Sequence, residues 1–132
     1  MAIRIHHIAL KVSDTEKAAR MLYDKGGFKA NETAYFAEVG MQIGFVNYQG
    51  ILMELLQPID DTCPIINDKD GLHHIAFEME NLDKFHTQIR NIPIFQEVQD
   101  IRKGREGRIF FFRMKANPSI WYECMEKQKR DE

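Results

Sequence analysis

Two histidines and two glutamates recur at matched positions in the two halves of this 132-residue chain. His7 and His74 each belong to a copy of the phrase His-His-Ile-Ala and lie 67 residues apart, while Glu54 and Glu123 lie 69 residues apart. One internal duplication with a small difference in loop length accounts for both separations. Two imidazoles and two carboxylates would suit a divalent cation such as zinc, nickel, cobalt, iron or manganese, with positions left open for water or substrate.

Strand alternation gives these side chains a common direction. Each histidine is followed two residues later by an alanine, Ala9 or Ala76, so each is predicted to point to a sheet face that large apolar groups do not fill. Glu54 stands inside the apolar run 51–56, where an unpaired carboxylate would be costly unless a cation compensates it. The alternative is that these are ordinary half-buried histidines and that the glutamates face solvent from edge strands.

Composition excludes several classes of function. Hydrophobic residues make up 44% and charged residues 29% of the chain, which describes a globular protein. A net charge of −2 without a basic block argues against a nucleic-acid partner. No apolar run approaches the ~20 residues that a bilayer span needs, and no signal peptide is recognisable. We therefore expect a cytoplasmic protein with a small-molecule ligand and no membrane contact. The sequence also allows a homodimer.

Hydrophobic periodicity predicts the element order β-α-β-β-β twice. Apolar spacing, capping residues and Gly-rich or Pro-rich turns place the first module at about 1–58, a linker at about 59–70 and the second module at about 71–126. The predicted strands are 4–12, 33–39, 42–48, 51–57, 72–79, 95–101, 108–114 and 119–125, and the predicted helices are 13–27 and 81–91. Residues 103–107 are predicted as a turn.

Neither module is large enough to stand alone, so the two must share a core. We predict a single α+β domain over residues 1–132, in which tandem βαβββ modules form a curved mixed sheet around a central cavity with the helices outside. Cys63 and Cys124 lack the spacing of a zinc site or a disulfide framework and are expected to be free thiols.

Four sequence motifs, or phrases, make the chain resemble a known superfamily. They are His-His-Ile-Ala at 6–9, Met-Glu-Leu-Leu-Gln-Pro at 53–58, Gly-Leu-His-His-Ile-Ala-Phe-Glu at 71–78 and Tyr-Glu-Cys at 122–124. Together they resemble the vicinal oxygen chelate superfamily, which includes glyoxalase I, methylmalonyl-CoA epimerase, extradiol dioxygenases and the fosfomycin and bleomycin resistance proteins. The resemblance covers essentially the whole chain and is strongest for the epimerase branch, with the glyoxalase I-like branch next.

The resemblance implies a metal shell of His7, Glu54, His74 and Glu123 around one divalent ion. It also implies an epimerase or glyoxalase-type lyase that abstracts a proton α to the carbonyl of an acyl thioester or a 2-oxoaldehyde adduct, with the metal as Lewis acid. A methylmalonyl-CoA epimerase-like or lactoylglutathione lyase-like enzyme is therefore expected. The alternative is a non-catalytic small-molecule-binding or resistance protein of the same fold.

Glu123 is implied as one catalytic base, but the second base is open. The resemblance to the epimerases implies a carboxylate on a middle strand of the first module, but the corresponding positions carry Gln42 and Gly44. Glu54 could serve instead, or Glu38 if the strand register differs from the predicted one.

Two further residues are weaker candidates for substrate contact. Arg108 could meet a substrate carboxylate or phosphate, or it could be an exposed turn arginine. In the run 110–112 the three phenylalanine rings must alternate between core and cavity, and Phe112 is the candidate for the cavity.

Overall fold

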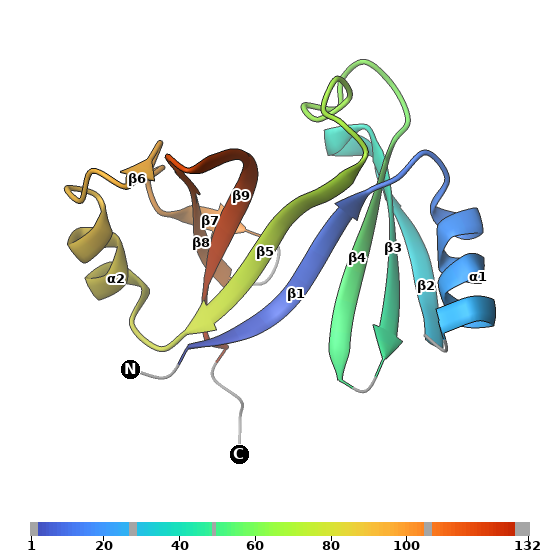
Figure 1. The fold of residues 1–132 in the computed structure, drawn as a ribbon, viewed down its shortest axis with the longest axis horizontal. Helices are drawn as coiled ribbons and strands as arrows, with labels where there is room; N and C mark the ends of the chain where they lie inside the picture. The colour runs from blue at the N-terminus through green and yellow to red at the C-terminus, as the bar shows by residue number, and fades with distance from the viewer. Residues whose placement is uncertain (1–2, 27–28, 49, 105–106, 129–132) are drawn as a thin grey trace. The chain divides into compact units, whose positions relative to one another are not determined.

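The structure, a computed structural model, describes residues 3–26, 29–48, 50–104 and 107–128. These residues form two α-helices, a short 3-10 helix and nine β-strands (Figure 1). The order is that of two successive βαβββ modules, as predicted, except that the second module contains one additional short strand, β7. The elements are β1 (Ile3–Lys11), α1 (Thr15–Gly26), β2 (Lys29–Phe36), η1 (Ala37–Val39), β3 (Met41–Tyr48), β4 (Ile51–Pro58), β5 (Gly71–Met79), α2 (Leu82–Ile89), β6 (Phe95–Gln96), β7 (Arg102–Gly104), β8 (Gly107–Met114) and β9 (Asn117–Glu126).

The chain divides into two compact units. The N-terminal unit comprises residues 7–73, and the C-terminal unit comprises residues 1–6 and 74–132. The division passes through β1 and β5, so each of these strands contributes residues to both units. The predicted linker 59–70 belongs wholly to the N-terminal unit.

In the N-terminal unit the strand order is β2-β3-β4-β1. β1 and β4 run parallel and the other neighbours run antiparallel, which gives the mixed sheet that was predicted. α1 covers one face of this sheet, where Val46 and Leu55 are fully buried and Ala19 contributes from the helix (Figure 1). The helix starts after Asp14, whose side chain accepts a hydrogen bond from the Lys17 N–H at 3.1 Å.

In the C-terminal unit the strand order is β5-β9-β8-β6, and β7 pairs with β8. The parallel pair is β5–β9, which matches the β1–β4 pair of the first module. Asn81 caps the start of α2, as its sequence position predicted: its side chain accepts a hydrogen bond from the Lys84 N–H at 3.0 Å. The helix packs through Leu82 and Ile89 onto a core that includes Phe110.

The predicted strand 95–101 is wrong over most of its length. Only Phe95–Gln96 forms β6, because Glu97 adopts a φ of 50° that a continuing strand cannot accommodate. The chain then crosses beside β8, where the Gln99 N–H donates to the Phe111 carbonyl at 2.9 Å. It pairs again as β7, of which residues 103–104 were predicted as part of a turn.

Smaller differences concern the ends of elements. β2 starts at Lys29 and ends at Phe36, and η1 occupies the last three residues of the predicted strand 33–39. Gly27, which was predicted to terminate the first helix, lies outside the described residues. No helix within the described ranges is both long and apolar enough to cross a membrane.

Candidate functional site

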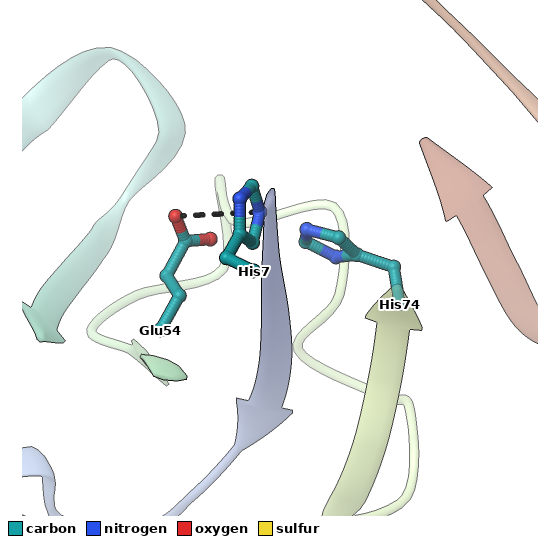
Figure 2. Close-up of side chains that lie close together, drawn as sticks. All are labelled: His7, Glu54 and His74. Carbon is teal, nitrogen blue, oxygen red and sulfur yellow. Dashed lines mark ion pairs between the residues drawn. The ribbon is translucent and has the colours of Figure 1, made fainter. Parts of the chain in front are cut away.

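The N-terminal unit brings His7 and Glu54 together on the sheet face opposite α1. Ala9 lies directly across from Glu54 in the parallel β1–β4 pair, so His7, Ala9 and Glu54 share one face. His7 Nε2 lies 3.9 Å from Glu54 Oε2, and the two side chains are 7% and 14% exposed (Figure 2). The apolar run around Glu54 therefore holds a carboxylate that lies beside an imidazole.

Apolar groups surround this pair within the unit. Phe45 stands directly across from Glu54 in the β3–β4 pair, and the same sheet face carries Ile43 and Leu56. Cys63 and Ile65 of the segment 59–70 pack against those residues. The segment is therefore part of the core on this face and not an extended connection.

Lys11 fixes that segment in place. Its side chain is 8% exposed, and its ammonium donates to the carbonyls of Ile66, at 3.1 Å, and Asp68. Asp70 supplies a carboxylate 3.8 Å away. Two carbonyls and one carboxylate satisfy this buried cation, so Lys11 is a structural residue on the same face as His7.

The C-terminal unit repeats the arrangement with His74 and Glu123. His74 Nε2 lies 3.3 Å from Glu123 Oε1, and the side chains are 7% and 11% exposed. Ala76 is directly across from Glu123 in the parallel β5–β9 pair, which reproduces the relation of Ala9 to Glu54. The repeat-related residues of the sequence thus form one His–Glu pair on the face opposite the helix in each unit.

Each pair fits part of a divalent-metal shell by its chemistry. Two ligands at about 2.1 Å from one ion lie about 3 Å apart, close to the 3.3 Å and 3.9 Å separations in the two pairs. Imidazole nitrogen and carboxylate oxygen are donors that borderline divalent cations accept. Near-complete burial of His7, His74 and Glu123 also limits competition from bulk water.

The middle strand of the first module does not supply a carboxylate to this face. Gln42 is directly across from Gln57 on the α1 side of the sheet, and its Nε2 donates to Thr15 Oγ1 at 2.8 Å. Gly44 pairs with Leu55 on the same side. Gln42 is therefore a structural residue that holds the start of α1. Glu38 belongs to η1, and its side chain lies outside the described residues.

Arg108 lies on strand β8 and not in a turn. It is directly across from Lys103, and its guanidinium donates from Nη1 to Asp83 at 3.1 Å and from Nε to Glu126 at 3.1 Å. The hydrogen bonds from Arg108 hold the pKa of the Asp83 carboxyl below its ordinary value. Two carboxylates engage this arginine, so an incoming substrate anion would compete with both of them.

Phe112 is a core residue. It is 5% exposed and packs edge-on against Phe95 at 5.2 Å and stacked against Tyr122 at 5.2 Å. Phe111 instead lies on the sheet face that carries His74 and Glu123, called the site face below, and its ring centroid is 5.8 Å from that of His74. The alternation of side chains indicated that neighbouring rings lie on opposite faces of the strand. Which ring lies on which face follows only from the pairing of Phe111 with Glu123.

A duplicated βαβββ fold with a buried His–Glu pair on the sheet face opposite each helix defines a glyoxalase-like domain. Residues 6–112 match the family model described as the Glyoxalase/Bleomycin resistance protein/Dioxygenase superfamily, and the chain belongs to that superfamily. This is the family that the four sequence phrases resemble, so that expectation is confirmed.

Named relatives come from the epimerase branch. The chain is 30% identical over 114 residues to the mitochondrial methylmalonyl-CoA epimerase of Homo sapiens, a match that covers 83% of the chain and 65% of the human protein. It is 29% identical over 84 residues to an ethylmalonyl-CoA/methylmalonyl-CoA epimerase of Cereibacter sphaeroides, covering 60% of the chain and 63% of that protein. The chain thus spans just under two thirds of the length of these relatives.

Solved structures confirm the fold. A hypothetical protein of Bacillus halodurans superposes with a TM-score of 0.82 at 20% identity, covering 100% of this chain and 99% of that one. A variant of Streptomyces coelicolor methylmalonyl-CoA epimerase, in complex with 2-nitronate-propionyl-CoA, superposes with a TM-score of 0.72 at 21% identity, covering 98% and 97%.

Proposed function

We propose that the chain is an epimerase of methylmalonyl-type acyl-CoA thioesters and depends on one divalent metal ion. The observation that carries this proposal is the repeated His–Glu pair, which lies at equivalent strand positions in both units with little exposure to solvent. The similarity to relatives named methylmalonyl-CoA epimerase supports the choice of substrate.

The proposed metal ligands are His7, Glu54, His74 and Glu123. All four carry donor atoms of the kinds that such an ion binds. The distance from imidazole nitrogen to carboxylate oxygen in each His–Glu pair suits two neighbouring ligands of one ion. When bound, the ion would polarise the thioester carbonyl as a Lewis acid and so acidify the carbon next to it.

The chain's own carboxylates would move the proton. In our proposal the Glu123 carboxylate takes the proton from the α-carbon of the thioester, and the electron pair of that C–H bond moves into the carbonyl to give an enolate. A second carboxylic acid returns a proton to the opposite face of the α-carbon, which inverts the configuration. Glu54 and Glu38 are the candidates for this second residue.

Solvent deuterium exchange tests the proposal. Protein purified without a histidine tag is loaded with cobalt or another divalent ion and incubated with methylmalonyl-CoA in D2O, and mass spectrometry follows deuterium at the α-carbon. We expect exchange in the wild type and its loss in Glu123→Gln. Glu126→Gln is the matched control, because it lies on the same strand but faces Arg108 and should keep wild-type exchange.

Two other outcomes would reject the epimerase. Formation of lactoylglutathione from methylglyoxal and glutathione, without exchange into methylmalonyl-CoA, would indicate the glyoxalase-type lyase. A protein that binds a small ligand tightly but supports neither reaction would be a binding or resistance protein. Exchange that is unchanged in metal-free protein would reject the metal dependence, which elemental analysis tests directly: we expect about one equivalent per wild-type chain and its loss in His74→Ala.

A further inference from the structure

The site face of the C-terminal unit carries a guanidinium that the proposed reaction does not use. Arg102 lies in β7 directly across from Ile109, so its side chain is on the same sheet face as Ile109 and, two residues further along β8, Phe111. Its Cζ atom lies 5.5 Å from the centroid of the Phe111 ring. That ring in turn contacts His74, so a continuous set of contacts joins Arg102 to the His74–Glu123 pair.

In the described part of the chain, the absence of a paired carboxylate distinguishes Arg102 from Arg4 and Arg113 of this unit. Arg4 donates to Glu78 at 2.9 Å, and Arg113, which lies over Trp121, is held by Glu97. Within the described residues, Arg102 has no carboxylate at ion-pair distance, and its side chain is exposed. It thus presents an uncompensated positive charge at the edge of the site face.

The aromatic contact orients this charge. A guanidinium over an aromatic ring gains a cation–π attraction and can still bind an oxyanion through two hydrogen bonds from its N–H groups. Stacking also restricts the rotamers of the arginine before a ligand arrives, so less conformational entropy is lost on binding. An arginine held in this way suits a carboxylate or a phosphate.

We propose that Arg102 binds an anionic group of the acyl-CoA substrate whose reacting carbon lies at the His74–Glu123 pair. This inference rests on the proposed function and adds a specificity-determining residue to it. Both the free carboxylate of a malonyl-type acyl group and the phosphates of coenzyme A are oxyanions of the required kind. Arg102 is a binding residue in this proposal and takes no part in proton transfer.

Substitution of Arg102, with a neighbouring lysine as control, tests the proposal. Arg102→Gln should raise KM for methylmalonyl-CoA by about ten- to a hundredfold, as loss of one charge-assisted contact does, and should leave kcat near the wild-type value. Arg102→Lys should recover part of the loss, because it keeps the charge but not the bidentate geometry. Lys103→Gln removes an equal charge from the opposite side of β7, where Lys103 pairs with Arg108, and should leave KM unchanged.

A truncated substrate identifies the anion. The methylmalonyl thioester of pantetheine keeps the acyl carboxylate and lacks every phosphate of coenzyme A. A KM penalty in Arg102→Gln that persists with this thioester assigns the carboxylate to Arg102, and a penalty that disappears assigns a phosphate.

The outcomes separate this inference from the proposed function. Wild-type turnover together with equal KM values for wild type and Arg102→Gln on both thioesters overturns the role of Arg102 and leaves the epimerase intact. Absence of turnover in metal-loaded wild type overturns the epimerase. In that case calorimetry with methylmalonyl-CoA still tests whether Arg102 binds the ligand. An affinity that is at least tenfold weaker in Arg102→Gln than in wild type supports the proposal, and equal affinity or no binding overturns it.

Discussion

Phe111 stands directly across from Glu123 in the antiparallel β8–β9 pair, and its ring packs against that of His74 in a T-shaped arrangement. Its neighbours in sequence, Phe110 and Phe112, turn to the other side of the sheet and are 0% and 5% exposed in the core under α2. One side of β8 thus stabilises the C-terminal unit, and the other side forms the surroundings of the candidate site.

Substitution of the two adjacent rings should separate these roles. We expect Phe112→Ala to lower the free energy of unfolding by about 3–5 kcal/mol, because it removes a ring packed on all sides. Phe111→Ala should cost much less, because its ring is only partly buried, but should impair substrate binding and raise KM. Urea unfolding and steady-state kinetics of both variants measure the difference, and equal losses of stability would contradict the assignment of faces.

The sequence predicted the duplication and the alternation of side chains along these strands. It did not predict which residues of β8 face the candidate site. His7 and His74 could be placed because the repeat supplies a partner for each and because Ala9 and Ala76 mark the face. A run of three phenylalanines gives no such indication of the face, since either assignment leaves large apolar rings on both sides of the sheet. Only the pairing of β8 with β9 decides which ring lies beside Glu123.

The second catalytic carboxylate can be identified by comparing two variants. If Glu38 is the second base, Glu38→Gln should abolish deuterium exchange and retain about one metal equivalent. Glu54→Gln should lower metal content instead, because it removes a donor beside His7. Elemental analysis and exchange are measured on the same samples. Retained metal with abolished exchange in Glu54→Gln, and full exchange in Glu38→Gln, would assign the base to Glu54.

Thr15 should be critical for stability and not for catalysis. It is fully buried, accepts a hydrogen bond from Gln42 at 2.8 Å, and its N–H donates to Gln57 at 2.9 Å. Thr15→Val would leave the half-buried Gln42 donor without its acceptor, and we expect a loss of about 1–3 kcal/mol in the free energy of unfolding. Thr15→Ser keeps the hydroxyl and serves as the control. A Thr15→Val variant as stable as Thr15→Ser would show that the hydrogen bond contributes nothing.

Residues 95–104 show a second limit of sequence-based prediction. Phe95 and Val98 are apolar and no proline or glycine interrupts 95–101, so a single strand was the natural prediction. The positive φ of Glu97 and the hydrogen bond from Gln99 to Phe111 arise from tertiary packing, which local propensity does not report. The short strand β7, and with it the position of Arg102, could not be predicted for the same reason.

Both cysteines should be unreactive in the folded protein. Cys124 is 0% exposed and Cys63 is 2% exposed. Burial, and secondarily the neighbouring Glu123, raises the pKa of the Cys124 thiol, so the nucleophilic thiolate is scarce near neutral pH. We expect a thiol reagent to label neither cysteine under native conditions and both in guanidinium chloride. Rapid native labelling of Cys63→Ser, which retains Cys124 alone, would contradict this burial.

Acidification should weaken the attachment of α2 through Asp83 and Arg108. Hydrogen bonds from Arg108 lower the pKa of the Asp83 carboxyl in the folded protein. A carboxyl with a depressed folded pKa contributes stability that is fully present above its unfolded pKa, about 3.9, and is lost as the pH falls through the folded value. Asp83→Asn should therefore be less stable than wild type at neutral pH, and the difference should shrink as the pH falls below about 4.

Chemical unfolding of both proteins across pH 2–7, in the same set of buffers, measures this difference in the free energy of unfolding. Asp100→Asn is the control, because Asp100 is exposed and, within the described residues, has no ion pair with an arginine or lysine. Its stability difference from wild type should stay small over the same range. A gap between wild type and Asp83→Asn that is constant with pH would mean that the ion pair with Arg108 does not stabilise the fold, and that packing through Leu82 and Ile89 alone attaches the helix.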